Sequence, residues 1–251
     1  MTALVTGAGT GIGAATARAL AAAGHPVAVA DLDLASARSL AAELPDGAAV
    51  EIDVRDGASV AAACKEAVSE LGPLAVWVSC AGVSSMGRFV ELNEQEIDWY
   101  LNVNARGAIL CGQVAARQFI AQGDGGIIVN VASMAGKRGG VPYLAHYIAS
   151  KFAVVGLTQA MAFELAPNQI RVNAVCPGYV DTGMQDREIE WEATLRGLTT
   201  DEVIESHLAD TPQRVTQTPE DVAGVIAFLA SPAAAKMTGE SVAINGGSFM
   251  D

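Results

Sequence analysis

The first 24 residues constrain the fold most, because they combine a strand, a glycine-rich turn and a helix. Residues 2–5 form a short β-prone run, the turn 6–13 is rich in glycine, and an alanine-rich helical pattern follows as far as Gly24. Glycines let a backbone approach phosphate oxygens closely, and the first turn of a helix supplies free N–H donors and a positive dipole end. The segment therefore predicts a unit that binds the pyrophosphate of a dinucleotide.

Asp31 indicates which dinucleotide is bound. A second β-prone run, residues 27–30, ends at Asp31, eighteen residues after Gly13. A carboxylate at this place accepts hydrogen bonds from the adenosine ribose and repels a 2′-phosphate. No Arg or Lys occurs in the turn 6–13 or directly after Asp31. The sequence favours NAD over NADP as the cofactor.

β-prone and helical segments alternate along the chain without a break in composition. Such alternation predicts a doubly wound α/β fold, in which helices cover both faces of a parallel sheet. A chain of 251 residues with 51% hydrophobic residues suits one large domain, 1–251. We expect strands at 2–6, 27–31, 48–52, 74–79, 126–132, 170–175 and 241–244, and helices at 12–23, 34–43, 57–70, 94–118, 146–166 and 219–230.

Tyr147 and Lys151 are one turn apart in a predicted helix and therefore share a helix face. A free tyrosine has a pKa of about 10 and is a poor base at neutral pH. An ammonium group fixed beside the phenol favours phenolate, and such a tyrosine takes a proton from an alcohol or returns one to an alkoxide. The pair alone is a weak signal, because two common residues also meet at this spacing by chance.

Six motifs occur in an order and spacing that resemble the short-chain dehydrogenase/reductase family in its common single-domain form, over essentially the whole chain. They are Thr6-Gly7-(x3)-Gly11-Ile12-Gly13, Asp53-Val54, Asn104-Ala105-Arg106-Gly107, Ser133, Tyr147-(x3)-Lys151 and Pro177-Gly178. The resemblance implies a Rossmann-type sheet of seven strands in the order 3-2-1-4-5-6-7. It also implies an oxidoreductase that uses a nicotinamide cofactor.

The resemblance assigns roles to four catalytic residues. Ser133 would hold the substrate oxygen, and Tyr147 would transfer the proton. Lys151 would lower the pKa of Tyr147 and bind the nicotinamide ribose. Asn104 would anchor a water molecule that relays the proton.

A cofactor groove is implied by the same resemblance. Asp53 and Val54 would contact the adenine, and Thr182 the nicotinamide carboxamide. The family usually carries Asn-Asn-Ala-Gly after the fourth strand, where this chain has residues 79–82, Ser-Cys-Ala-Gly. Because that segment acts largely through its backbone, we expect altered cofactor affinity and retained activity. The full predicted set of cofactor-binding residues is Gly7, Thr10, Gly11, Ile12, Gly13, Asp31, Asp53, Val54, Cys80, Ala81, Gly82, Tyr147, Lys151, Pro177, Gly178, Val180 and Thr182.

Residues 183–215 are polar and acidic and follow the end of a predicted strand, where open α/β sheets bind ligands. We interpret this irregular stretch as a mobile substrate lid, in preference to a decorative loop. Met184 and Trp191 within it could cap a substrate or could anchor the lid to the body. Lys137 and Arg138 are interpreted as solvated residues, although they could bind an anionic group of the substrate.

Composition and charge exclude several classes of function. The net charge of −13 argues against a nucleic-acid partner, which would require a basic face. No uninterrupted apolar run has the length of a membrane span, and the first strand begins at residue 2, so we expect no signal peptide and a cytoplasmic protein. The four scattered cysteines are expected to be buried free thiols, and the three dispersed histidines predict no metal site. His146, beside Tyr147, is interpreted as a packing residue.

The predicted helix 146–166 indicates a second subunit. Between Phe152 and Ala166 only Glu164 is charged, so the helix is apolar nearly all round and must be buried on more than one face. One face can pack on the sheet, and the simplest partner for the other is the same helix of a second copy. The family resemblance implies a homotetramer or a homodimer.

Together these features predict an NAD-dependent oxidoreductase that interconverts a small polar secondary alcohol and its ketone. The segment 133–139 and the stretch 183–215 resemble those of polyol, sugar alcohol and vicinal diol dehydrogenases in the family. One alternative is a reductase of 3-oxoacyl thioesters or bulkier ketones, which more often uses NADP. The other is a non-catalytic NAD(H)-sensing or scaffold protein of the same fold, which would usually lack the catalytic Tyr, Lys or Ser.

Overall fold

A parallel sheet forms the centre of the molecule. The computed structural model describes residues 1–250, and its seven strands lie side by side in the order β3-β2-β1-β4-β5-β6-β7, all parallel. The predicted strands and their predicted order are confirmed, with ends shifted by at most two residues. The strands are β1 (Thr2–Thr6), β2 (Val27–Asp31), β3 (Gly47–Glu51), β4 (Leu74–Ser79), β5 (Gly126–Val131), β6 (Ile170–Pro177) and β7 (Ser241–Ile244).

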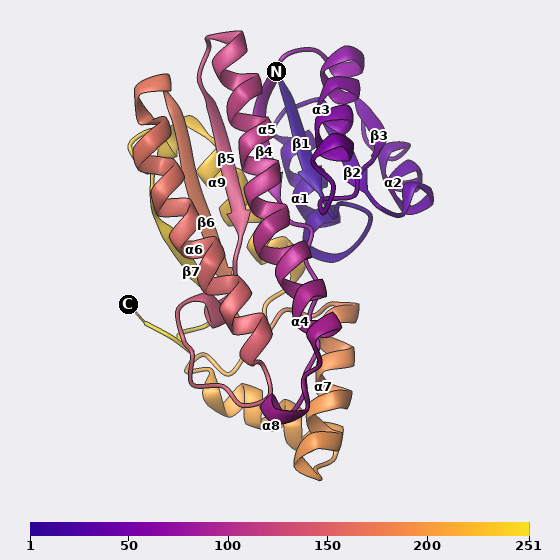
Figure 1. Cartoon of the computed structure of the whole chain (residues 1–251), viewed down its shortest axis with the longest axis vertical. Coiled ribbons are helices and arrows are strands. Elements are labelled where there is room, and N and C mark those ends of the chain that lie inside the picture. Colours follow the sequence, from indigo (N-terminus) through magenta and orange to yellow (C-terminus); the bar gives the residue numbers. More distant parts are fainter. Residues whose placement is uncertain (251) are drawn as a thin grey trace.

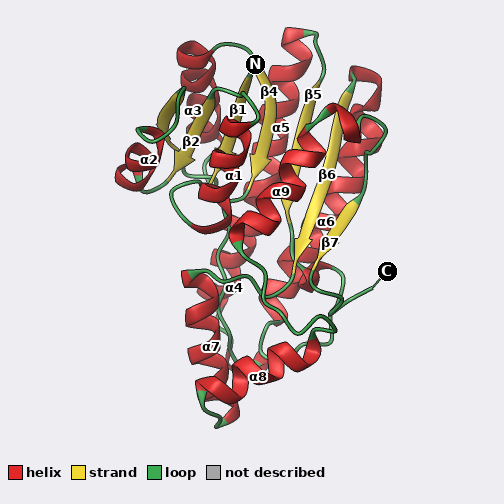
Figure 2. Cartoon of the chain, turned by 180° about the vertical axis from the view of Figure 1, so that it is seen from behind, coloured by secondary structure: helices red, strands yellow, loops and turns green. Residues whose placement is uncertain are grey.

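Helices cover both faces of this sheet, which confirms the doubly wound α/β fold. Three of them lie on the face turned to the viewer in Figure 1: α3 (Gly57–Leu71), α5 (Gly107–Gln122) and α6 (Ala145–Leu165). Three others lie on the face turned to the viewer in Figure 2: α1 (Gly11–Ala22), α2 (Leu34–Ala41) and α9 (Pro219–Ala230). Short 3-10 turns are η1 (Phe89–Glu91), η3 (Met134–Gly136), η4 (Ala166–Asn168) and η5 (Pro232–Ala234).

The core follows the two-residue period of the strands. In β1, Ala3 and Val5 belong to the apolar cluster shared with α1 and α9, whereas Leu4 belongs to the cluster shared with α3 and α5. Both sets are fully buried, which is why the strand reads as a continuous apolar run. A sheet covered on both faces in this way leaves its carboxyl edge as the place for a site.

The predicted helix 94–118 is interrupted by a π-helical turn. Asn93 and Glu96 form a capping box at the start of α4 (Glu94–Tyr100), and η2 (Leu101–Arg106), a π-helix, then joins α4 to α5. Such turns are rare and occur frequently at functional sites. Asn104 lies in η2 and is buried, so the interruption coincides with a residue of the predicted site.

Residues 183–196 and 200–210 are helical, so the prediction of an irregular stretch is wrong for most of its length. Thr182 caps α7 (Gly183–Arg196) by accepting a hydrogen bond from the backbone of Gln185, and Thr199 forms a capping box with Glu202 at the start of α8 (Thr200–Asp210). Both helices extend beyond the carboxyl edge of the sheet, at the bottom of Figures 1 and 2. The interpretation of this segment as a mobile lid stays a prediction.

The apolar helix α6 packs on the sheet with one face only. Lys151, Val154 and Thr158 are buried against the body, while Phe152 and Phe163 are exposed. Within residues 1–250, one helical stretch, Ala145–Asn168, is long and apolar enough to span a membrane. Core helices of globular proteins meet the same criterion of length and composition.

Candidate active site

One large cavity lies at the carboxyl edge of the sheet, between the strand ends and α7 and α8. Its volume is about 740 Å³, and it extends from Asp31 at the end of β2 to His207 of α8. Open α/β sheets bind ligands at this edge. The residues predicted from sequence that line it are Gly7, Thr10, Gly11, Ile12, Gly13, Asp31, Asp53, Val54, Cys80, Ala81, Gly82, Ser133, Tyr147, Lys151, Pro177, Gly178, Val180 and Thr182.

The glycine turn between β1 and α1 fits a dinucleotide pyrophosphate. Gly7 has a φ of +63°, and a Cβ on it would lie 2.7 Å from the Cα of Ala81, so only glycine is accommodated there. Thr10, the N-cap residue of α1, makes no side-chain cap hydrogen bond. The N–H groups of the first turn therefore lie at the cavity wall without a capping side chain, where an anion can accept their hydrogen bonds.

Asp31 presents a fixed carboxylate beside this turn. Its Oδ2 accepts a hydrogen bond of 2.8 Å from the backbone N–H of Gly9, and its Oδ1 accepts one of 2.9 Å from Asp33. Because the backbone itself orients the group, each oxygen keeps a lone pair for another donor, such as a ribose hydroxyl. The carboxylate also places negative charge where a 2′-phosphate would lie.

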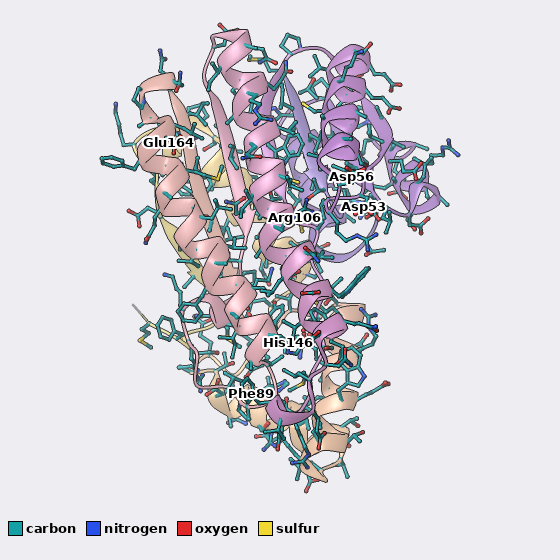
Figure 3. All side chains as sticks on the ribbon, in the orientation of Figure 1. Asp53, Asp56, Phe89, Arg106, His146 and Glu164 are labelled. Atoms are coloured by element: carbon teal, nitrogen blue, oxygen red, sulfur yellow. The ribbon has the colours of Figure 1, made fainter. Side chains whose placement is uncertain are left out.

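Asp53 is held by Arg55, a contact that the sequence reasoning missed. The Nε and Nη2 atoms of Arg55 donate to Oδ1 and Oδ2 of Asp53 over 2.9 and 2.6 Å, and this hydrogen bonding lowers the pKa of Asp53. The guanidinium also lies 4.6 Å from the ring centroid of Trp99. Arg55, Trp99 and Val54 all line the cavity, and Figure 3 labels their neighbour Asp53.

Thr6 and Asn104 fix the backbone that follows β4. The Thr6 hydroxyl accepts hydrogen bonds of 3.1 Å from the N–H groups of Cys80 and Ala81. The Asn104 amide accepts from the N–H of Val83 and donates to its carbonyl, both over 2.9 Å. The segment is therefore held through its backbone, and a cysteine at position 80 supplies the same N–H as any other residue.

Asn104 lies behind the large cavity and does not line it. The second hydrogen on its Nδ2 is donated to the hydroxyl of Ser150 over 3.0 Å. Both amide hydrogens are thus used within the protein, and only a lone pair of Oδ1 and the backbone remain for a water molecule. Asn104 acts as a clamp between η2, α6 and the segment after β4.

Tyr147, Ser133 and Lys151 come together where α6 meets the turn after β5. A side-chain hydrogen bond joins Ser133 and Tyr147. The Nζ atom of Lys151 lies 5.6 Å from the ring centroid of Tyr147 and donates to the carbonyl of Val131 over 3.0 Å. A Cβ on Gly136 would lie 2.7 Å from the carbonyl oxygen of Lys151, so this glycine permits the close contact that positions Ser133.

Burial dominates the electrostatics of these groups. It raises the pKa of Tyr147 above its ordinary value, the Glu188 carboxylate adds to the rise, and the hydrogen bond with Ser133 opposes it. Burial lowers the pKa of Lys151 to about 8. The sequence suggested that Lys151 would hold the pKa of Tyr147 low, but in the protein alone the desolvation of a phenolate outweighs that attraction.

Charged side chains of α7 and α8 line the other half of the cavity. Met184, Glu188 and Glu192 follow one another at intervals of four residues, so they share one face of α7, and all three line the cavity. His207 of α8 contacts Glu192 over 2.8 Å, and its ring stacks on Tyr179 with 4.0 Å between centroids. This half therefore offers carboxylate and imidazole groups to a ligand.

Arg138 connects the segment after Ser133 to the end of α8. It forms an ion pair of 2.7 Å with Asp210 and lines the cavity. The interpretation of Arg138 as a solvated residue is wrong, because its partner lies 72 positions away and only the fold brings them together. Met184 lines the cavity and Trp191 does not. Of these two residues, which the sequence gave the same two possible roles, only Met184 is placed to contact a substrate.

His146 is a packing residue, as predicted. It is 5% exposed, its Nε2 lies 3.1 Å from the hydroxyl of Ser85, and its ring meets the edge of Tyr100. Figure 3 places it near the N-terminal end of α6, far from Asp53. Among residues 1–250, no group of three or more His, Cys, Asp or Glu side chains is arranged to hold a metal ion.

Comparison with known proteins decides the family. The family model described as "Enoyl-(Acyl carrier protein) reductase" matches residues 7–248. A short-chain dehydrogenase/reductase of Armillaria gallica is 39% identical over 257 residues, which cover 99% of this chain and 96% of that protein. The chain belongs to the short-chain dehydrogenase/reductase family.

Two solved structures of similar proteins agree over the whole length. Sorbitol-6-phosphate 2-dehydrogenase SrlD from Erwinia amylovora has a TM-score of 0.94 and 33% identity, with 100% of each chain covered. The 3-ketoacyl-(acyl-carrier-protein) reductase from Brucella melitensis, complexed with NADH, has a TM-score of 0.87 and 33% identity, with 98% of this chain and 97% of that chain covered. This short-chain dehydrogenase/reductase is therefore an oxidoreductase of a family that binds nicotinamide cofactors and acts on CH–OH or keto groups.

The motifs of this short-chain dehydrogenase/reductase identified the cofactor half of the cavity better than the substrate half. Sequence reasoning missed the cavity-lining residues Arg55, Trp99, Tyr179, Glu188, Glu192 and His207. Signals existed for both helices: residues 184, 188 and 192 repeat at helical spacing in α7, and Thr199-x-x-Glu202 is a capping-box pattern at the start of α8. No local pattern indicates that Tyr179 stacks on His207, 28 residues further along the chain.

Proposed function

We propose that the protein is an NAD-dependent dehydrogenase that interconverts a small polar secondary alcohol and its ketone, with Tyr147 as the acid–base residue. The observation that carries this proposal is that one cavity contains the glycine turn and Asp31 at one end and Tyr147 and Ser133 further along. A dinucleotide with its adenosine at Asp31 and its pyrophosphate on the first turn of α1 would extend toward Tyr147.

NAD is the proposed cofactor because of the charge beside the glycine turn. The oriented carboxylate of Asp31 suits two ribose hydroxyls and would repel a 2′-phosphate. Arg55, the cation nearest to the adenine end of the cavity, is already paired with Asp53. Thr182, which caps α7, lies over Gly11 and would contact the nicotinamide carboxamide.

Tyr147 and Ser133 would act on the oxygen of the substrate. In oxidation the Tyr147 phenolate takes the hydroxyl proton, and in reduction the phenol returns it to the developing alkoxide. Ser133 donates a hydrogen bond to the same oxygen and stabilises its negative charge. The bound nicotinamide supplies the chemistry of hydride transfer, and the protein supplies orientation and charge.

Lys151 would support the proton transfer from behind Tyr147. Its ammonium group favours phenolate once the pocket is filled, and it would hold the nicotinamide ribose. The predicted proton-relay water at Asn104 remains part of the proposal. It would hydrogen-bond to the backbone of Asn104 or to the free lone pair of its Oδ1. The Asn104 clamp keeps Gly82 and Val83 in place beside Lys151.

A polyol, sugar alcohol or vicinal diol is the proposed substrate class, because the substrate half of the cavity contains Glu188, Glu192 and His207. A reductase of 3-oxoacyl thioesters is the second candidate, favoured by the family description and by the similarity to a 3-ketoacyl-(acyl-carrier-protein) reductase. An alkyl chain in this half would desolvate carboxylates without giving them a hydrogen bond, which is unfavourable.

We also propose an oligomeric state and a cellular location for the protein. Short-chain dehydrogenases/reductases are commonly oligomeric, and we propose a homotetramer or a homodimer joined through α5 and α6. No nucleic-acid or membrane partner is proposed. Cys64, Cys80 and Cys111 are free thiols, which is typical of a reducing compartment, and we propose a cytoplasmic location.

An absorbance assay tests the proposal. The protein is incubated with NAD and a panel of polyols, diols and hydroxy acids while NADH formation is followed at 340 nm, and the reverse reaction is tried with small hydroxyketones and 3-oxoacyl thioesters. We expect oxidation of polyols or diols and weaker activity with NADP. Tight NADH binding without turnover of any substrate would instead support the non-catalytic sensor, and activity confined to thioesters would support the second candidate.

A further inference from the structure

Glu188 is a half-buried residue, and the position of its carboxyl group needs an explanation. It lies in the middle of the α7 face that lines the cavity, one turn after Met184 and one turn before Glu192. Burial raises the pKa of Glu188, and the charge of Glu188 in turn raises the pKa of Tyr147 and of Lys151. The carboxyl group therefore lies close to the reacting end of the pocket.

Glu192, one turn further along the same face of α7, differs from Glu188 because its charge is paired. Glu192 contacts His207 over 2.8 Å and forms an ion pair with Arg196, so its charge is compensated inside the protein. Within residues 1–250, Glu188 forms no ion pair; the Ser84 hydroxyl beside its carboxyl group and the more distant charges of His207 and Arg187 only partly oppose the rise of its pKa. Burying a carboxyl group without an ion pair is costly, and such groups concentrate at functional sites.

The neighbours of Glu188 indicate what it would bind. Ser133 and Tyr147 would hold the oxygen that reacts, and Glu188 of α7 lines the same cavity and acts electrostatically on Tyr147. A carboxyl group accepts hydrogen bonds in either protonation state, so it suits a donor on the carbon next to the carbinol. An alkyl group in that place would leave Glu188 desolvated and without this bond.

We propose that Glu188 selects substrates that carry a hydroxyl group on the carbon next to the reacting carbinol, so that the enzyme prefers vicinal diols and polyols to simple secondary alcohols. This inference rests on the proposed function, since it concerns the substrate of the same site. Glu188 is a specificity-determining residue and takes no part in proton transfer.

Two alcohols of the same carbon skeleton test the inference. The ratio of kcat/KM for 2,3-butanediol to that for 2-butanol is measured in the wild type and in the Glu188→Gln and Glu188→Leu variants, with NAD as cofactor. The wild type should prefer the diol by about 100-fold, as expected for one hydrogen bond to a charged group. Glu188→Leu should lose that preference, chiefly through a higher KM for the diol, and Glu188→Gln should retain part of it.

The control is Glu190→Gln, which changes an exposed carboxylate of the same helix outside the cavity and should leave the ratio unchanged. NADH binding, followed by fluorescence, should be the same in all variants and shows that each is folded.

An unchanged ratio in Glu188→Leu would overturn the inference while the proposed function stands. A stronger, Glu188-dependent preference for 3-amino-2-butanol would also overturn it, since the group would then recognise a cation. Absence of oxidation of every alcohol by the wild type would overturn the proposed function itself.

Discussion

At the scale of single residues, the chemistry depends on a phenol and an ammonium group that share a buried environment. Tyr147 is harder to ionise and Lys151 loses its proton more readily, its pKa being about 8, because both are buried. Sequence spacing predicted that the two would be neighbours, since residues at i and i+4 share a helix face. It could not predict the desolvation, which comes from the sheet, α7 and the segment after β4 closing around them.

Removal of the Tyr147 hydroxyl tests its role. Tyr147→Phe should lower kcat by about 1,000-fold or more, because acid–base catalysis contributes roughly 10²–10⁴-fold and no other group is placed to replace the phenol. NADH binding, measured by fluorescence titration, should stay within about twofold of the wild type. Turnover at the normal rate in this variant would contradict the proposed mechanism.

The charge of Glu188 should be visible in the pH profile. Because this charge raises the pKa of both Tyr147 and Lys151, Glu188→Gln removes a negative charge and lowers both values. The phenolate then forms at lower pH, and the ammonium group is lost at lower pH. The acid and alkaline limbs of kcat/KM for alcohol oxidation should therefore both move to lower pH.

The matched Glu190→Gln variant should show the wild-type profile. Initial rates from pH 6 to 10 with a constant-ionic-strength buffer give the two limbs. A shift of either limb to higher pH in Glu188→Gln would contradict the electrostatic account.

At the scale of elements, the hydrophobic pattern predicts the strands and most helices, but it does not predict the irregular turns that connect them. The pattern from residue 94 to 118 reads as one helix, and the structure inserts the π-helical η2 in its middle. One additional residue in a turn hardly changes an apolar period, so it leaves no clear signal in the sequence. The insertion is stabilised by tertiary contacts, above all by the three hydrogen bonds of Asn104.

Loss of the Asn104 clamp should destabilise the fold. Asn104→Ala leaves the N–H and carbonyl of Val83 without partners in a half-buried place, so we expect the free energy of unfolding to fall by about 2–3 kcal/mol. Urea denaturation followed by circular dichroism measures it. The control is Asn102→Ala in the same π-helical turn, whose side chain makes no hydrogen bond within residues 1–250 and which should cost less than about 1 kcal/mol.

At the scale of the whole molecule, α5 and α6 form an apolar face that the monomer leaves uncovered. Ile109 and Ile120 of α5 and Phe152 and Phe163 of α6 are each more than 40% exposed, and Phe163 reaches 90%. Figure 1 shows the two helices side by side on one face of the sheet. Contiguous apolar surface of this kind marks an interaction site, and a second copy of the chain would cover it symmetrically.

A charge on this face should break the assembly. Phe163→Asp places a carboxylate on the proposed interface and should shift the protein to a smaller oligomer or a monomer in light scattering coupled to gel filtration. Phe89→Asp changes a phenylalanine that is 76% exposed on η1. Figure 3 shows Phe89 at the opposite end of the molecule from Glu164, the neighbour of Phe163, and this control should keep the native mass. Equal masses for wild type and Phe163→Asp would exclude the α5–α6 face as the interface.

The sequence by itself determined the strand order through its family resemblance, the glycine turn with Asp31, and the spacing of Ser133, Tyr147 and Lys151. The strand order came from that resemblance alone, whereas the glycine turn, Asp31, Ser133 and the Tyr147–Lys151 pair can each be recognised within one short segment of the chain. The tertiary structure alone decided how Asn104 is used, that Arg138 pairs with Asp210, and that Glu188 faces the reacting end of the cavity. Those contacts join segments far apart in the chain, and their energies depend on burial, which a linear pattern does not contain.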